Sequence, residues 1–355
     1  MNILDFLYEQ DFKKINFLDR KISIKAKKSF IYGTKKSGKT YLMFDYLNRF
    51  PKKETLYIDL NDDRIDKEEV KNNLQNFISQ KGINTLAIDN FDFSFALPQC
   101  ENILISSDRN HQIEGFEKIH LFPLDFEEFI SFYKKYSNLE TMFNIYAKLG
   151  TYPHTILHYK ENTYQNMQEM IKASLSKEEY MVFRKFALFQ GMKKSLFQIY
   201  NLIKKEHKIS KDTFYKTVNE LKEREFIFLI DKFDQPKSPK KIFLIDFTLK
   251  NIFTFQKDFM KMFENMIFLE LIKRGYDLTY TENAELYDPK NKIVFLSMPF
   301  LPADIIKTKL NLLENGFKKE EIKKVYVITL EYEESFFKNE TEYLIESFWN
   351  FAIKI

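Results

Sequence analysis

The chain has 355 residues, of which 44% are hydrophobic and 30% are charged, a composition that excludes an intrinsically disordered protein. This length predicts more than one domain. The single cysteine, Cys100, excludes an internal disulfide bond and a zinc cluster built from cysteines, and the net charge of +4 is too small to indicate a partner by itself.

The N-terminal residues do not resemble an export signal. Residues 1–6 include an early aspartate and lack the basic and then apolar pattern of a signal peptide. The longest apolar run, residues 293–303, contains two prolines and is too short to cross a membrane as a helix. We therefore expect a cytoplasmic protein that makes no membrane contact. The first 28 residues are expected to form a helical lead-in followed by a charged strand or turn.

Residues 33–40 fit the phosphate-binding pattern Gly-x4-Gly-Lys-Ser/Thr at every fixed position. The β-prone run 29–32 precedes them, and residues 41–47 space their apolar side chains as a helix does. In this context the N–H groups of the loop and the helix N-terminus can bind phosphates, whereas an isolated match would indicate only a surface turn. Lys39 is expected to reach the β- and γ-phosphates, and the Thr40 hydroxyl to bind Mg²⁺. The predicted nucleotide contacts are Gly33, Thr34, Lys35, Lys36, Ser37, Gly38, Lys39, Thr40 and Tyr41.

Short β-type runs alternate with helical segments from residue 29 onward. Because their apolar residues are continuous rather than alternating, these strands suit a sheet buried on both faces. The alternation predicts a parallel sheet covered by helices, as in the α/β fold of P-loop proteins. The expected strands are residues 29–32, 56–60, 85–89, 102–106 and 118–121, with a helix over 66–80.

Two aspartates at predicted strand ends are candidates for holding Mg²⁺ through water. Asp89 ends the third strand, about fifty residues after the loop, and Asp59 ends the second. The strand order of such folds favours Asp89. Either aspartate can instead serve as a turn or helix-capping residue.

Hydrolysis needs a group that orients the attacking water, and Asn90 occupies the position where a glutamate is usual. An asparagine can hydrogen-bond a water but cannot take its proton, which predicts slow hydrolysis or a nucleotide-gated switch. Asp92 can substitute if its loop turns inward. Ser106, next to Ser107 at the fourth strand's end, is a candidate contact for the γ-phosphate or the water, or a turn cap. Arg109 is a further candidate for a phosphate contact.

These residues, followed by Leu-Phe-Pro-Leu-Asp-Phe-Glu-Glu-Phe at 121–129, resemble the archaeal-type AAA ATPases. The family's corresponding segment opens a helical lid, and here Asp125 replaces its serine. Gly150 to Pro153 resembles the family's Gly-x-Pro motif, one residue longer, which implies that Pro153 packs near adenine; a turn between lid helices is the alternative. The resemblance implies ATP as the nucleotide. The departures from the family are Asn90 and the lack of a clear arginine finger.

Residues 177–252 are expected to form a winged helix, which this family often carries. Three helical segments, beginning near residues 177, 195 and 210, precede two β-type runs at 226–230 and 241–245. Residues 193–241 hold 13 Lys and Arg against 7 Asp and Glu, a local basic patch suited to duplex DNA. A lid or a surface that binds a protein is the alternative role. The predicted DNA contacts are Lys211, Lys216, Lys237 and Lys240.

From residue 253 the layout resembles the restriction-endonuclease-like domain of the same family. An amphipathic helix over 260–271 precedes expected strands at 278–281, 292–296 and 325–330. That nuclease chemistry needs an acid on one strand and Glu-x-Lys on the next, but residues 295–299 contain neither acid nor lysine. The sequence therefore predicts a degenerate nuclease fold. The nearby carboxylates are Glu282, Glu285 and Asp288.

The predicted domains are an ATPase core (1–122), a lid (123–176), a winged helix (177–252) and a nuclease-like domain (253–355). The predicted function is Mg²⁺-dependent ATP hydrolysis that controls a DNA-binding module. A switch that holds ATP with little turnover, and binds a protein partner or itself, is one alternative. A metal-dependent nuclease that uses Glu285 or Asp288 is another.

Overall fold

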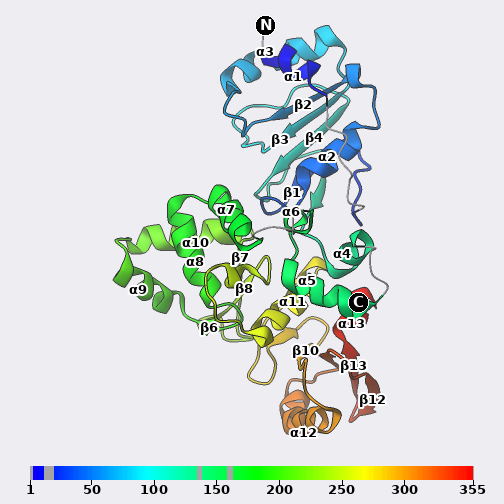
Figure 1. Ribbon diagram of the computed structural model, residues 1–355, viewed down its shortest axis with the longest axis vertical. Coiled ribbons are helices and arrows are strands. Elements are labelled where there is room, and N and C mark those ends of the chain that lie inside the picture. The colour runs from blue at the N-terminus through cyan, green and yellow to red at the C-terminus, as the bar shows by residue number, and fades with distance from the viewer. Residues whose placement is uncertain (1–2, 12–19, 134–137, 158–162, 355) are drawn as a thin grey trace. The chain divides into compact units, whose positions relative to one another are not determined.

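The computed structural model describes residues 3–11, 20–133, 138–157 and 163–354 (Figure 1). The chain divides into two compact units, Met1–Pro123 and Leu124–Ile355. In the described part of the chain, every helix is too short or too polar to cross a lipid bilayer.

The first unit contains a five-stranded parallel sheet, as the alternation of strands and helices predicts. Its strands follow the order β2-β3-β4-β1-β5, and each neighbouring pair is parallel. The strands are β1 (Lys28–Tyr32), β2 (Thr55–Asp59), β3 (Thr85–Asp89), β4 (Asn102–Ser107) and β5 (Glu117–His120). The central strands β3 and β4 are buried along their whole length, which explains why their apolar runs do not alternate with polar residues.

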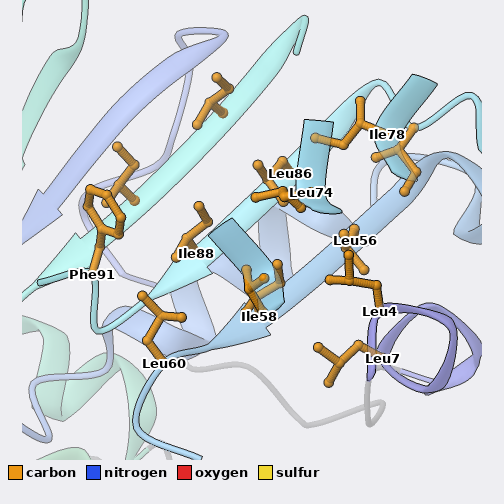
Figure 2. Close-up of a cluster of buried hydrophobic side chains, with 14 of the residues drawn as sticks. Leu4, Leu7, Leu56, Ile58, Leu60, Leu74, Ile78, Leu86, Ile88 and Phe91 are labelled. Carbon is orange, nitrogen blue, oxygen red and sulfur yellow. The ribbon is translucent and has the colours of Figure 1, made fainter. Parts of the chain in front are cut away.

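Helices cover both faces of this sheet. On one face, α1 (Ile3–Glu9) and α3 (Lys67–Lys81) pack against even-numbered side chains of β2 and β3. Figure 2 shows this cluster, in which Leu4 of α1 lies beside Leu56 of β2. On the other face, α2 (Lys39–Leu47) packs against odd-numbered positions such as Ala87. The period of two along a strand sends neighbouring side chains to the two layers. A short 3₁₀ helix, Lys52–Glu54, precedes β2.

The strand order brings the candidate site residues to one edge of the sheet. β4 lies between β1 and β3, and its last residues pair with Ile31 and Tyr32 of β1. Asp59 of β2 pairs with Asp89 of β3. In a parallel sheet the carboxyl ends of the strands share one edge, and ligands bind where neighbouring strands lead to opposite sides. The loop that follows β1 begins at this edge.

The second unit begins with four helices: α4 (Phe126–Phe132), α5 (Leu139–Leu149), α6 (Pro153–Leu157) and α7 (Thr163–Ser174). Asp125 caps α4, since its side chain accepts a 2.7 Å hydrogen bond from the N–H of Glu128 while the Glu128 side chain accepts from the N–H of Asp125. An aspartate serves as well as a serine at this position.

Three helices and a three-stranded sheet follow. The helices are α8 (Lys177–Leu188), α9 (Leu196–Glu206) and α10 (Lys211–Glu223), and β6 (Lys193–Lys194), β8 (Lys240–Leu244) and β7 (Ile227–Ile230) form the sheet in that order. The three helices and the hairpin lie where the sequence pattern predicts them. Buried aromatic residues, including Phe183, Phe186 and Phe214, form their core. A short 3₁₀ helix, Leu249–Ile252, follows.

The chain ends in a mixed five-stranded sheet of order β12-β13-β11-β10-β9. The β10–β11 and β11–β13 pairs are parallel, and the two edge pairs are antiparallel. The elements are α11 (Phe259–Lys273), β9 (Leu286–Asp288), β10 (Ile293–Ser297), α12 (Ala303–Lys319), β11 (Lys324–Thr329), β12 (Glu334–Lys338), β13 (Thr341–Ser347) and α13 (Phe348–Lys354).

The strand predicted at 278–281 is wrong, because residues 279 and 280 form only isolated bridges to Tyr287 and Lys232. The Thr281 side chain accepts hydrogen bonds from the N–H groups of Asn283 and Ala284, and this tight turn ends the pairing.

Candidate nucleotide-binding site

The loop between β1 and α2 requires glycine at Gly33. Its φ of +146° lies where L side chains are disfavoured, and a Cβ atom there would lie 2.3 Å from the carbonyl oxygen of Leu121. Gly38, with φ of +105°, immediately precedes α2. Arg20 ties the loop to the sheet edge by donating to the carbonyl oxygens of Ser37 (2.9 Å) and Phe122 (2.7 Å). These contacts hold the loop in a tight, backbone-lined curve.

The Lys39 side chain turns into this curve. Only 6% of the residue is exposed, and its ammonium donates to the carbonyl oxygens of Gly33 (2.8 Å) and Thr34 (2.9 Å). The hydroxyl oxygens of Thr34 and Ser37 are buried in the same loop and have no hydrogen-bond partner among the described residues. Buried hydroxyls are normally paired, so a cationic loop with two unpaired hydroxyls suits an oxygen-rich anion such as a phosphate chain.

Asp89 is the centre of a hydrogen-bond network at the end of β3. Its Oδ2 accepts from the Thr40 hydroxyl at 2.5 Å and from the Tyr57 hydroxyl at 2.9 Å. Its Oδ1 accepts from the Ser106 hydroxyl and from the N–H of Asn90. A threonine hydroxyl beside an aspartate carboxylate supplies the hard oxygen ligands that Mg²⁺ prefers.

Asn90 has a φ of +55°, which asparagine tolerates better than most residues. Its side-chain amide donates a 2.8 Å hydrogen bond to Oδ1 of Asp59. Asp59 therefore positions the Asn90 side chain, while the hydroxyls of Thr40, Ser106 and Tyr57 contact Asp89. Asp92 does not turn toward this network as a substitute base, since its carboxylate pairs with Lys67 at 2.5 Å.

The other predicted positions are placed as follows. Ser107 is buried at the end of β4, and its Oγ accepts from the N–H of Arg109 at 3.4 Å. Pro153 begins α6 in the second unit, so its adenine contact remains a prediction.

Two residues of the site were not predicted, Tyr57 and Arg20. Burial, followed by the charges of Asp89 and Asp59, raises the pKa of the Tyr57 phenol, which keeps this group a hydrogen-bond donor. Nothing in the local pattern distinguishes this tyrosine from one that only packs in a strand, and Arg20 acts through contacts distant in the chain.

The lysines predicted to contact DNA differ in their surroundings. Lys211 and Lys216 on α10 and Lys237 in the hairpin are exposed. Lys240 is half-buried and forms an ion pair with Asp231, and it also donates to the carbonyl oxygen of Pro236 at 2.6 Å. Both of these contacts of Lys240 lie within the β7–β8 hairpin.

The carboxylates of the nuclease-like region are engaged in contacts of their own. Glu282 pairs with Lys232, and Glu285 pairs with Lys241 and Lys193. Asp288 accepts hydrogen bonds from Lys290 and Asn291. In the described ranges, no three His, Cys, Asp or Glu side chains are grouped so that they could hold a metal ion.

Comparisons with known proteins show two similarities. No family model matches the sequence. The chain is 27% identical over 333 residues to the uncharacterized protein MJ1544 of Methanocaldococcus jannaschii, an alignment that covers 79% of this chain and 74% of that protein. The structure is also similar to that of the Walker-type ATPase Paby2304 of Pyrococcus abyssi, with 15% sequence identity and a TM-score of 0.45. The superposition covers 63% of this chain and 90% of that one.

Proposed function

We propose that the protein binds Mg²⁺–ATP in the loop 33–40 and hydrolyses it. The observation that carries the proposal is the contact between the Thr40 hydroxyl and Asp89, which brings the last residue of a complete phosphate-binding motif to the carboxylate at the end of β3. This pair forms only if the strands lie in the order that places both groups at one edge. A glycine- and lysine-rich surface turn would not need such a partner.

Each residue of the site has a role in this proposal. The loop N–H groups and Lys39 bind the phosphates, while Thr40 and Asp89 hold the metal ion, which neutralises charge on the phosphates. Ser106 and Tyr57 orient Asp89 through hydrogen bonds to its two oxygens. Phosphoryl transfer asks a protein mainly to position the reacting groups and stabilise charge, and this network does both.

ATP turnover by the purified chain tests the proposal, with Lys39→Ala as the inactive variant. Lys71→Ala is the matched control, because this exposed lysine of α3 lies outside the loop. We expect turnover that requires Mg²⁺ and is lost only in Lys39→Ala. Equal turnover in both variants, or no ATP binding by the wild type in equilibrium dialysis, would contradict it.

A second candidate function is an ATP-held switch with little turnover. It is favoured by the Asn90 amide, which is bonded to Asp59 where a catalytic carboxylate would be needed. Tight, Mg²⁺-dependent ATP binding without measurable hydrolysis would support this candidate over the first. Both candidates share the same binding residues, so ATP affinity is measured before turnover.

We further propose that residues 177–252 form a winged helix that binds duplex DNA and whose binding depends on the nucleotide. Its support is the exposure of Lys211, Lys216 and Lys237 together with the local excess of basic residues. Fluorescence anisotropy of labelled duplex DNA at two salt concentrations, with and without ATP, tests it. Replacing the three lysines with alanine should weaken binding and reduce its salt dependence. Salt-independent binding, or none, would leave this region as a protein-binding surface.

A further inference from the structure

The C-terminal sheet ends in an exposed antiparallel edge strand. β12 occupies the outer position of the sheet and pairs only with β13 among the sheet's strands (Figure 1). Phe337, the fourth of its five residues, is 78% exposed. An edge strand presents N–H and C=O groups that can pair with another strand, and proteins usually protect such an edge with charged side chains, proline or a covering element.

The register of the β12–β13 hairpin identifies the backbone groups that face outward. Asn339 and Glu340 form a two-residue turn in which both residues have positive φ, so the flanking pair Lys338–Thr341 is hydrogen-bonded. Hydrogen-bonded and non-bonded pairs then alternate along the ladder. The backbone groups of Ser335 and Phe337 therefore point away from β13. Within the described part of the chain, no other element hydrogen-bonds to either backbone.

The side chains of β12 are self-complementary in charge. Its sequence is Glu-Ser-Phe-Phe-Lys, with Glu334 two residues before Phe336 and Lys338 two residues after it. In an antiparallel pair of identical strands centred on Phe336, each Glu334 lies opposite Lys338 of the second copy. Opposite charges at facing positions stabilise an antiparallel pair, and like charges destabilise it. The same centre places Ser335 opposite Phe337, the two residues whose backbone groups face outward.

We propose that β12 pairs antiparallel with β12 of a second copy of this chain, about a twofold axis at Phe336. The Ser335 and Phe337 backbones exchange hydrogen bonds across this axis, and the two sheets become continuous. A twofold axis brings the same surface of both copies together, so that surface must be complementary to itself. The charge pattern of β12 meets this requirement. The proposal does not depend on the nucleotide site.

The face of β12 that carries Phe336 supports this pairing. Phe336 stacks on Tyr343 with 4.9 Å between ring centroids, and both side chains line a hollow of about 260 Å³ beside α12. Lys307 of α12 pairs with Glu334 at 2.9 Å. Lys338 pairs with Glu314 of the same helix at 2.6 Å and donates to the Asn311 side chain at 2.8 Å. These contacts hold Glu334 and Lys338 on the face of the sheet that packs against α12. In the proposed dimer, Glu334 and Lys338 of the second copy lie on the same face. Phe336 meets its counterpart beside the hollow and shields it from water.

Sedimentation equilibrium of the full chain without nucleotide tests the proposal with two charge-reversal variants, Glu334→Lys and Lys338→Glu. The wild type should approach twice the 42.9 kDa monomer mass as concentration rises. In a dimer of either variant, positions 334 and 338 carry the same charge and lie opposite each other twice across the interface. Its self-association should therefore weaken about tenfold or more. An equimolar mixture of the two restores both opposite pairs, so it should again approach the dimer mass.

Lys27→Glu is the matched control, because Lys27 is also an exposed lysine in an ion pair, with Glu101 of the first unit. It should leave the association unchanged. Circular dichroism of each variant checks that the chain is folded, and the mixture tests the interface even if both variants lose some stability. A monomeric wild type, undiminished dimers of either variant alone, or a mixture that stays monomeric would overturn the proposal. A dimer lost equally in Lys27→Glu would also overturn it.

Discussion

The hydroxyl of Thr40 donates a 2.5 Å hydrogen bond to Oδ2 of Asp89, 49 positions later in the chain. Thr40 is the second residue of α2, the helix that follows β1, and Asp89 ends β3. They meet because β4 lies between these two strands and all three carboxyl ends share one edge of the sheet. This contact connects the loop that is proposed to bind phosphates with the carboxylate that is proposed to hold the metal ion.

Removing the hydroxyl of Thr40 tests its metal role. Thr40→Val keeps the shape of the side chain, and we expect it to weaken Mg²⁺-dependent ATP binding by about tenfold to a hundredfold. Thr40→Ser keeps the hydroxyl and should retain most of the affinity. Titration of a fluorescent ATP analogue, with Mg²⁺ and with EDTA, measures both. Equal affinities of the two variants would exclude Thr40 from the metal site.

Adding a methyl group at Gly33 should distort the loop. The Cβ of Gly33→Ala would lie 2.3 Å from the Leu121 carbonyl oxygen, and φ is also unfavourable, so we expect a loss of about 2 to 4 kcal/mol in unfolding free energy. Gly82→Ala is the control, since Gly82 also has positive φ but no atom lies within 4 Å of its added Cβ. It should cost about 1 kcal/mol. Urea denaturation measures both, and equal losses would exclude the close approach as the cause.

The Tyr57 phenol should make stability pH-dependent in alkali. Burial and the nearby Asp89 and Asp59 raise its pKa in the folded protein, so its contribution to stability is complete below pH 10 and declines above it. In that range the unfolding free energy should fall by about 1.4 kcal/mol per pH unit more in the wild type than in Tyr57→Phe. Urea denaturation at pH 9 to 11 measures the difference, and parallel pH profiles would contradict the assignment.

A carboxylate introduced at position 90 tests whether Asn90 limits the rate of ATP hydrolysis. In Asn90→Glu the new side chain can accept a proton from water, and we expect turnover to rise by about tenfold or more. Asn90→Gln has the same length but no basic carboxylate, so it should not show this rise. Single-turnover ATP hydrolysis compares the two. If both variants are as slow as the wild type while ATP affinity is kept, position 90 does not limit hydrolysis.

The ion pair between Glu179 and Arg224 should be important for the stability of the second unit. The two side chains are 12% and 8% exposed, and the atoms that pair are 2.6 Å apart. Burial opposes ionisation of Glu179, but hydrogen bonds from Ser176 and Arg224 lower its pKa overall. Arg224→Ala would leave this carboxylate buried and unpaired, which should cost about 3 kcal/mol in unfolding free energy.

Acid titration checks the sign of the Glu179 effect. A carboxyl whose pKa is lowered by folding stabilises the protein above its unfolded pKa, near 4.3, and this stabilisation is lost as the pH falls through the folded value. The difference in unfolding free energy between wild type and Arg224→Ala should therefore narrow between pH 5 and pH 3. A difference that does not change with pH would show that packing, rather than charge, accounts for the loss.

The first unit could be predicted from sequence because its signals are local. The run 29–32, the motif 33–40 and the helix that follows are contiguous, and the continuous apolar strands indicated a buried parallel sheet. The C-terminal sheet was harder to predict. The β12–β13 hairpin was not predicted, and residues 278–281 were predicted as a strand although two of them form only isolated bridges. Whether such segments form strands depends on their partners more than on their own residues.

Local sequence was enough to predict the parallel sheet, the loop that matches a phosphate-binding motif, and the candidate residues Lys39, Thr40 and Asp89. Each of these follows from residue spacing or from the end of a strand. The fold was needed to find that Tyr57 and Ser106 both donate to Asp89. It was also needed to find that the Asn90 amide binds Asp59 and that Asp92 pairs with Lys67. It also decided which edge of the C-terminal sheet stays open. These contacts depend on strand order and register, which join residues far apart in the chain and which no local pattern specifies.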